Sequence, residues 1–185
     1  KVHDLTERYD KGEELSLMKE GGDFGVSMAE WGMLEKWVEF RTRFNPEILE
    51  IEQNIMSEEL GIAGTRDRSL ILPKFGRLLV DIKTGTYVGK EAWLQLSAYR
   101  AIDRANGLPE YDGVAICHLA AKTKTDGRAG SVQGKGWQLI IETDAKVIDE
   151  YYDIFCHTQK LWLSENAGLI PRQVSYSLSH KAIIS

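Results

Sequence analysis

Apolar residues recur along the chain at two spacings, one typical of helices and one typical of strands. Val2, Leu5 and Tyr9 fall on one face of a short helix at the start of the chain. The same spacing predicts three further helices, over residues 26–43, 90–106 and 144–165. On the last of these, Tyr151 and Leu161 share the apolar face. Runs rich in β-branched and apolar residues, bounded by glycine or proline, predict strands over residues 48–56, 62–72, 77–83, 114–120 and 137–142.

The resulting order of elements is α-α-β-β-β-α-β-β-α. It predicts an α/β (α+β) domain with a central mixed β-sheet flanked by helices. The sequence has no internal repeat and no linker rich in proline or serine, so we expect residues 1–185 to form a single domain. The first residue is Lys1 rather than methionine, which leads us to expect a fragment that lacks an N-terminal piece.

Composition and charge narrow the function without fixing it. Hydrophobic residues make up 43% of the chain and charged residues 28%, as in globular proteins. The net charge of −5 argues against a protein held on nucleic acid mainly by a basic surface, but allows an enzyme that uses a local groove and metal ions. No apolar run approaches the roughly 20 residues of a membrane-spanning helix. Because no signal peptide follows Lys1, we expect a cytoplasmic protein without membrane contact.

Two acidic residues and a lysine fall on neighbouring predicted strands. Asp81 and Lys83 are two residues apart, so both leave the same face of their strand, with Ile82 on the other. Asp67 stands near the end of the preceding strand, and a hairpin would bring its carboxylate beside Asp81. Two carboxylates are suited to bind Mg²⁺, which prefers oxygen ligands. The Lys83 ammonium is suited to stabilise the negative charge that develops on a phosphate during cleavage. A solvated ion pair of Asp81 and Lys83 is the alternative.

A glutamine and a tyrosine on the next predicted helix are further candidates for the same site. Gln95 and Tyr99 are four residues apart and therefore share one helix face. An amide and a phenol aligned there could both reach the cleft beside the aspartates. The alternative is a half-buried helix face whose polar ends are satisfied locally.

One histidine lies on the first predicted helix, ahead of these residues. The complete ordered set is His3, Asp67, Asp81-Ile82-Lys83 and Gln95-x-x-x-Tyr99. This set resembles the RecB-like branch of the PD-(D/E)XK nuclease superfamily, which includes phage-encoded exonucleases and the mitochondrial genome maintenance exonuclease. Residues 2–15 also resemble the histidine-bearing helix of those proteins. The resemblance implies a restriction-endonuclease-like core with α-β-β-β-α-β order, in agreement with the order predicted from periodicity.

The resemblance also implies a set of metal ligands. Asp67 and Asp81 would be the principal ligands of one or two Mg²⁺ or Mn²⁺ ions, and both count as catalytic. His3 would be an additional ligand, with the backbone carbonyl of Ile82 a contributor. Glu52, on the strand before Asp67, is a second-tier candidate whose alternative is a solvated glutamate on an edge strand. With only two cysteines in the chain, a four-cysteine iron–sulfur cluster is excluded.

Further residues are expected to act on the substrate. By resemblance, Lys83 would be the catalytic lysine, and Gln95 and Tyr99 would position the active site or the nucleic-acid strand. The arginines that flank Asp67 are suited to contact phosphate. Trp93 is the best candidate for stacking on a base. The polar loop 122–135 is either a basic segment that follows the phosphate backbone of the nucleic acid or an ordinary hairpin connection. The residues expected to contact nucleic acid are Arg66, Arg68, Trp93, Lys122, Lys124, Arg128 and Lys135.

The implied function is a metal-dependent DNA nuclease of the phage or prophage exonuclease type, which hydrolyses phosphodiester bonds with a metal-activated water. An RNA-directed nuclease of the same fold is one alternative. A nuclease-like, nucleic-acid-binding subunit of a larger complex is another, and the presence of both aspartates with Lys83 speaks against it. The chain has no phosphate-binding loop of the Gly-Lys-Thr/Ser kind, so a helicase or recombination partner would be a separate protein.

Overall fold

The computed structural model describes residues 1–18, 25–120 and 136–169. The helices in these ranges are α1 (Val2–Asp10), α2 (Met28–Phe44), α3 (Lys90–Ala105) and α4 (Ala145–Glu165). The strands in the same ranges are β1 (Glu47–Ser57), β2 (Ile62–Leu72), β3 (Gly76–Lys83), β4 (Gly113–His118) and β5 (Gln138–Glu142). The elements follow in the predicted order, and each boundary lies within two residues of the predicted one.

The strands form one mixed sheet in the order β1-β2-β3-β4-β5. β3 and β4 are parallel, and the other neighbouring strands are antiparallel. A parallel pair needs a crossover connection, and α3 supplies it between β3 and β4. The mixed sheet and the order of elements confirm the predicted α+β fold class.

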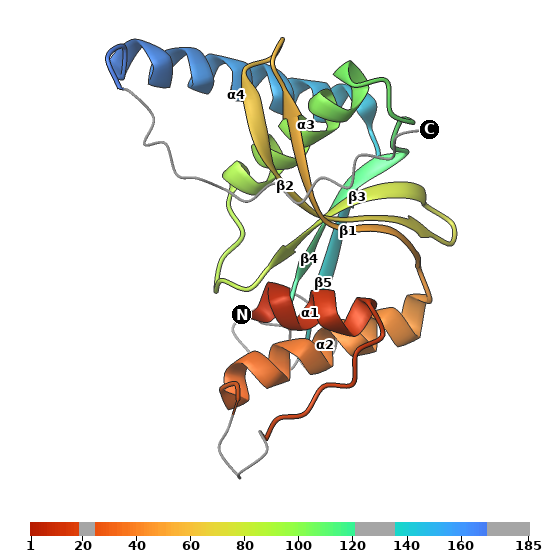
Figure 1. Ribbon diagram of the computed structural model, residues 1–185. Helices are drawn as coiled ribbons and strands as arrows, with labels where there is room; N and C mark the ends of the chain where they lie inside the picture. Colours follow the sequence, from red (N-terminus) through yellow and green to blue (C-terminus); the bar gives the residue numbers. More distant parts are fainter. Residues whose placement is uncertain (19–24, 121–135, 170–185) are drawn as a thin grey trace, which may run out of the picture.

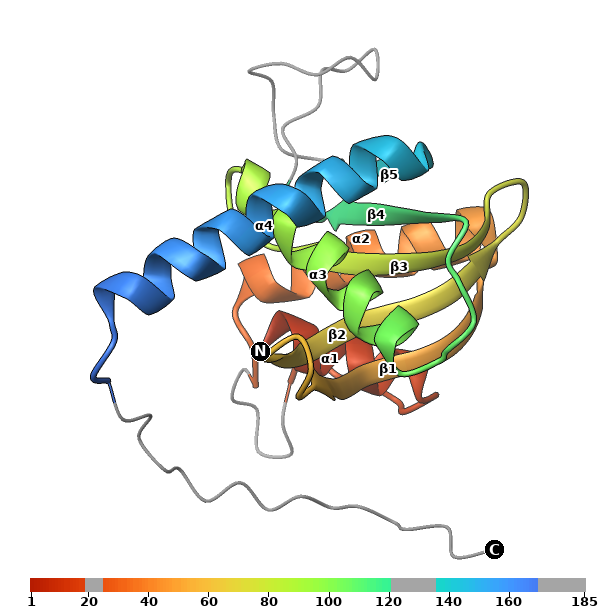
Figure 2. The same cartoon turned by 90° about the horizontal axis from the view of Figure 1, so that it is seen from above.

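Helices cover both faces of the sheet, with α1 and α2 on one side and α3 and α4 on the other (Figures 1 and 2). The core beneath α2 contains Trp37 and Phe40, which belong to the same buried cluster as Val80 of β3. The core beneath α3 contains Leu96, which belongs to the same cluster as Leu79 of β3. Neighbouring residues of a strand point to opposite faces, so β3 contributes to both cores and is buried on each side.

Local sequence fixes both ends of α2. The Ser27 hydroxyl accepts a hydrogen bond from the Glu30 backbone amide, and the Glu30 carboxylate accepts one from the Ser27 amide. This reciprocal pair is a capping box, which satisfies two backbone donors at the helix start. Asn45 ends the helix in a left-handed conformation, with φ of 42°, and Pro46 follows it. α2 is therefore capped at both ends, and α1 packs against it.

The β1–β2 hairpin extends beyond the strand beside it. β2 pairs with β3 only over Arg68–Leu72, whereas β1 and β2 remain paired as far as Ser57 and Ile62. The outer part of the hairpin reaches over α3 in Figure 1. Gly64 touches α3 there: a Cβ atom added to it would lie 2.5 Å from the Tyr99 hydroxyl oxygen. β2 and β3 thus part just beyond Arg68, and the candidate site lies at this opening.

The apolar face predicted for α4 differs from the buried one. Ile148 is the buried residue of this helix, and Leu161 is 59% exposed. α4 runs past the edge of the sheet in Figure 2, and its later part reaches the turn of the β1–β2 hairpin, where Gln159 Nε2 donates to the Leu60 and Gly61 carbonyls. Within residues 1–18, 25–120 and 136–169, no helix combines the length and apolar character needed to cross a membrane.

Candidate active site

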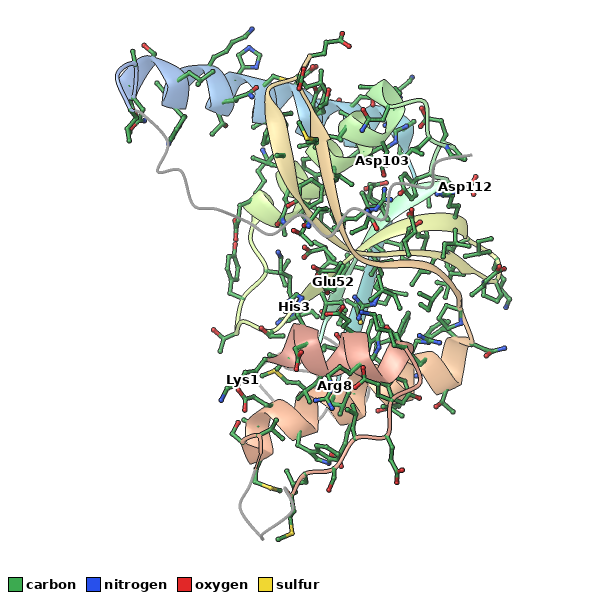
Figure 3. The ribbon with its side chains drawn as sticks, in the orientation of Figure 1. Lys1, His3, Arg8, Glu52, Asp103 and Asp112 are labelled. Atoms are coloured by element: carbon green, nitrogen blue, oxygen red, sulfur yellow. The ribbon has the colours of Figure 1, made fainter. Side chains whose placement is uncertain are left out.

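Three predicted metal ligands come together at the opening between β2 and β3. His3, Glu52 and Asp67 each offer one donor atom, and these atoms all lie within 4.8 Å of one another. His3 Nδ1 is 3.4 Å from Asp67 Oδ1 and 3.8 Å from Glu52 Oε1. Figure 3 shows His3 of α1 close to Glu52 of β1. We call these three residues the donor group.

Backbone geometry explains why the donor group converges. His3 lies in the first turn of α1, which packs against the sheet. Ile51 and Gln53 of β1 pair with the two β2 residues on either side of Asp67, so Glu52 lies opposite Asp67. Glu52 has a φ of 46°, a left-handed conformation that costs a non-glycine residue about 1–3 kcal/mol. Such strain persists where surrounding contacts enforce it, and here it accompanies a carboxylate of the donor group.

Asp67 also joins β2 to β3 where their backbone pairing ends. Its Oδ2 atom accepts a hydrogen bond from the Ile82 backbone amide at 2.7 Å. One carboxylate oxygen therefore anchors the side chain, while the other faces His3. Ile82 buries its side chain in the core, as predicted, and the proposed metal contact of its carbonyl stays a prediction.

In the absence of metal, the histidine of the donor group carries a positive charge at neutral pH. The neighbouring carboxylates of Asp67 and then of Glu52 raise the pKa of His3 to about 10, against an opposing effect of burial. The imidazole is therefore protonated at neutral pH and balances the carboxylates. A divalent cation that takes its place must displace this proton, since a metal-binding histidine is neutral.

The four other residues predicted to be catalytic form a chain of polar contacts beside the donor group: Asp81, Lys83, Gln95 and Tyr99. Lys83 Nζ lies 2.8 Å from Asp81 Oδ2 and donates a hydrogen bond to Gln95 Oε1 at 3.1 Å. Gln95 Nε2 in turn donates to the Tyr99 hydroxyl at 3.0 Å. The predicted sharing of a face by Asp81 and Lys83, and by Gln95 and Tyr99, is confirmed by these contacts.

Asp81 stands apart from the donor group but is coupled to it. Its side chain is buried, and burial raises its pKa to about 6, with the charge of Asp67 adding to the effect. Lys83 and His3 act in the opposite direction. The Asp81 carboxylate is therefore electrostatically coupled to Asp67, Lys83 and His3, and a nearby dication would favour its charged form.

These residues fit a divalent cation by their chemistry. The donor group offers one imidazole nitrogen and two carboxylates, and Asp81 adds a buried carboxylate that is electrostatically coupled to the group. Imidazole and carboxylate together suit Mn²⁺ and related ions, and carboxylates with water suit Mg²⁺. Lys83 places a cation at the edge of this acidic group, where a phosphate could meet it.

The prediction that Arg66 and Arg68 contact phosphate is wrong, because both side chains are buried. Arg66 is 2% exposed and pairs with Glu50 and Asp103, on the side of the sheet that carries α3. Figure 3 shows Asp103 on that side, away from His3. Arg68 is 0% exposed and points the other way, toward α1.

The other predicted nucleic-acid contacts have different outcomes. Trp93 stacks on Tyr151 of α4, with ring centroids 5.9 Å apart, so helix packing occupies one face of its indole. The basic residues Lys122, Lys124, Arg128 and Lys135 lie outside the described residues. Gly64 was not among the predicted site residues, although its lack of a side chain makes room for the Tyr99 ring. A glycine inside a predicted strand is a signal of such a close approach.

No family model matches the chain, and no curated protein matches its sequence. Among solved structures, the fold is similar to the crystal structure of a protein from Eubacterium rectale that bears the name "Putative exonuclease". The TM-score is 0.51 and the sequence identity is 13%, over 91% of this chain and 68% of that one. The comparison shows that the two proteins share an overall fold.

Proposed function

We propose that the chain is a metal-dependent DNA nuclease, an exonuclease of the phage or prophage type within the RecB-like branch. The observation that carries this proposal is the convergence of the donor group, His3, Glu52 and Asp67, beside the Asp81–Lys83 pair. The similarity in fold to a protein named as an exonuclease supports it, as do the sequence motifs.

The proposed chemistry divides between the metal and the chain. The donor group and Asp81 would hold a divalent cation, which would supply a bound water of lowered pKa and positive charge to offset that of the phosphate. Lys83 would hold its ammonium against the phosphate oxygens as negative charge develops on them. Gln95 accepts a hydrogen bond from Lys83 and donates one to Tyr99, so this chain of contacts fixes the direction of the lysine.

The test is cleavage of labelled linear DNA in the presence of Mn²⁺ or Mg²⁺. Asp67→Asn should abolish cleavage, because it removes the charge of a donor that lies 3.4 Å from His3. Asp153→Asn, the same chemical change on the exposed side of α4, should leave the rate unchanged. Metal-independent cleavage, or full activity of Asp67→Asn, would contradict the proposal.

Substrate class is tested in the same experiment with matched strands. Single-stranded DNA, double-stranded DNA and RNA of one sequence are compared at equal concentration, with the label at either end. Loss of DNA from its ends supports the proposed exonuclease. Preferential loss of RNA would replace DNA by RNA as the substrate while leaving the metal chemistry in place.

A further inference from the structure

A single buried arginine reaches all three residues of the donor group. Arg68 Nη1 donates to Glu52 Oε1 at 3.0 Å and to the Asp67 backbone carbonyl at 2.6 Å. Arg68 Nη2 donates to the Thr6 hydroxyl at 3.1 Å. The Thr6 hydroxyl donates to the His3 carbonyl at 2.9 Å, so this path extends to the third residue.

The guanidinium is itself held in a fixed direction. Its Nε atom donates to Asp10 Oδ2 at 2.7 Å, near the end of α1. Asp10 also pairs with Arg41 and accepts a hydrogen bond from the Trp37 indole, both on α2. The guanidinium carbon lies 5.5 Å from the centre of the Trp37 ring. Because Arg68 is fully buried among these partners, its planar guanidinium, with N–H donors on three nitrogens, is held in one orientation.

We propose that Arg68 is a positioning residue that assembles the metal centre before metal arrives. It turns the Glu52 carboxylate toward His3 and sets the place of α1, the helix that carries His3. The strained backbone at Glu52 fits this role, since a strained conformation needs contacts that hold it. The inference rests on the proposed function, because it gives the donor group its purpose.

A second arginine on the same strand is a matched control. Arg66 is also buried, and it also pairs with two carboxylates, those of Glu50 and Asp103. Its third hydrogen-bond partner is the Tyr111 hydroxyl. Within the described part of the chain, none of its bonded partners belongs to the donor group. Replacing either arginine should weaken the fold, but only one replacement should disturb the metal centre.

The experiment measures the affinity of the whole chain for Mn²⁺ by calorimetric titration, without substrate. Arg68→Lys keeps the charge and loses the fork, whereas Arg66→Lys makes the same change at the control position. Each variant is titrated below its own melting temperature, so that only folded protein is compared. We expect Arg68→Lys to weaken Mn²⁺ binding about 10–100-fold, as is typical when a partner of metal ligands is changed, and Arg66→Lys to leave it unchanged.

A purely structural role for Arg68 predicts a different result. In that case both variants melt earlier and bind Mn²⁺ as the unchanged chain does, which would overturn the inference. An equal loss of affinity in both variants would overturn it too. If the unchanged chain binds no Mn²⁺, the proposed function itself fails, and the inference falls with it.

Thr6→Val keeps the test decisive if Arg68→Lys does not fold. Valine has nearly the shape of threonine, but it breaks the path from Arg68 Nη2 to the His3 carbonyl. Loss of this link should weaken Mn²⁺ binding about fivefold, the equivalent of one hydrogen bond. Unchanged affinity in the folded Thr6→Val chain would refute the positioning role on the His3 side.

Discussion

Replacing Asp81 by asparagine should stabilise the metal-free protein at neutral and higher pH. Burial and the charge of Asp67 raise the pKa of Asp81 from 3.8 to about 6. Each pKa unit corresponds to about 1.4 kcal/mol, so the charged carboxylate costs the folded state about 3 kcal/mol relative to the unfolded chain. Asparagine keeps the shape and carries no charge, so Asp81→Asn removes that cost.

The sign of the pH dependence follows from the direction of the shift. The folded state holds the Asp81 proton more tightly than the unfolded chain does. The contribution to stability is therefore complete below pH 3.8 and is lost as pH rises through about 6. The advantage of Asp81→Asn should accordingly be near zero at about pH 4 and reach about 3 kcal/mol at about pH 8.

Urea denaturation in the presence of a chelator measures this difference directly. The unchanged chain, Asp81→Asn and the control Asp153→Asn are unfolded at both pH values. The control should show no comparable gain at the higher pH, because its carboxylate is exposed on α4. If Asp81→Asn is no more stable than the unchanged chain at about pH 8, then burial does not strain this carboxylate and the account of the site is wrong.

Three further predictions follow from the same residues. Mn²⁺ at 100 times its dissociation constant should raise the free energy of unfolding by about 2.7 kcal/mol, and Asp67→Asn should reduce this gain; identical melting curves in EDTA and Mn²⁺ would contradict it. Mn²⁺ binding near neutral pH should release a proton from His3, because the pKa of this residue is raised to about 10 and a metal-binding histidine is neutral. Calorimetric titration in two buffers of different ionisation enthalpy measures this release, and equal heats of binding in the two buffers would refute the prediction. Gly64→Ala should cost about 1–3 kcal/mol in urea denaturation by displacing Tyr99, whereas Gly32→Ala, where the new Cβ meets nothing within 4 Å, should gain about 0.5–1 kcal/mol; a Gly64→Ala chain as stable as the unchanged one would refute the contact.

The architecture and much of the site could be predicted because they depend on local patterns. Alternation along β3 places Asp81 and Lys83 on one face and buries Ile82 on the other. Helical spacing likewise places Gln95 and Tyr99 together. These relations depend on periods of two residues and of about 3.6, which a single sequence displays.

The fate of the two arginines could not be predicted from spacing. Arg66 and Arg68 are two residues apart on β2 and should share a face, yet they reach opposite sides of the sheet. Between the two arginines, the pairing of β2 with β3 ends, and Asp67 lies opposite Glu52, whose backbone is left-handed. Both features depend on tertiary pairing. Partners as distant in sequence as Asp103 decide which arginine is buried where.

The exposed end of α4 shows the same limit. Helical spacing identifies an apolar face on this helix, but not the layer that covers it. α4 meets α3 near Tyr151, through the stacked ring of Trp93, and then runs past the sheet (Figure 2). Leu161 therefore remains exposed although its position in the pattern predicts burial.

The most direct test of the central claim is the release of nucleotides from linear DNA by Lys83→Ala beside the unchanged chain, with Mn²⁺ present. Lys160→Ala, which removes an exposed lysine from α4, is the matched control. The account predicts metal-dependent release by the unchanged chain and the control, and loss of release in Lys83→Ala while Mn²⁺ still binds. Release that survives Lys83→Ala would show that the Asp81–Lys83 pair is not the centre of the chemistry.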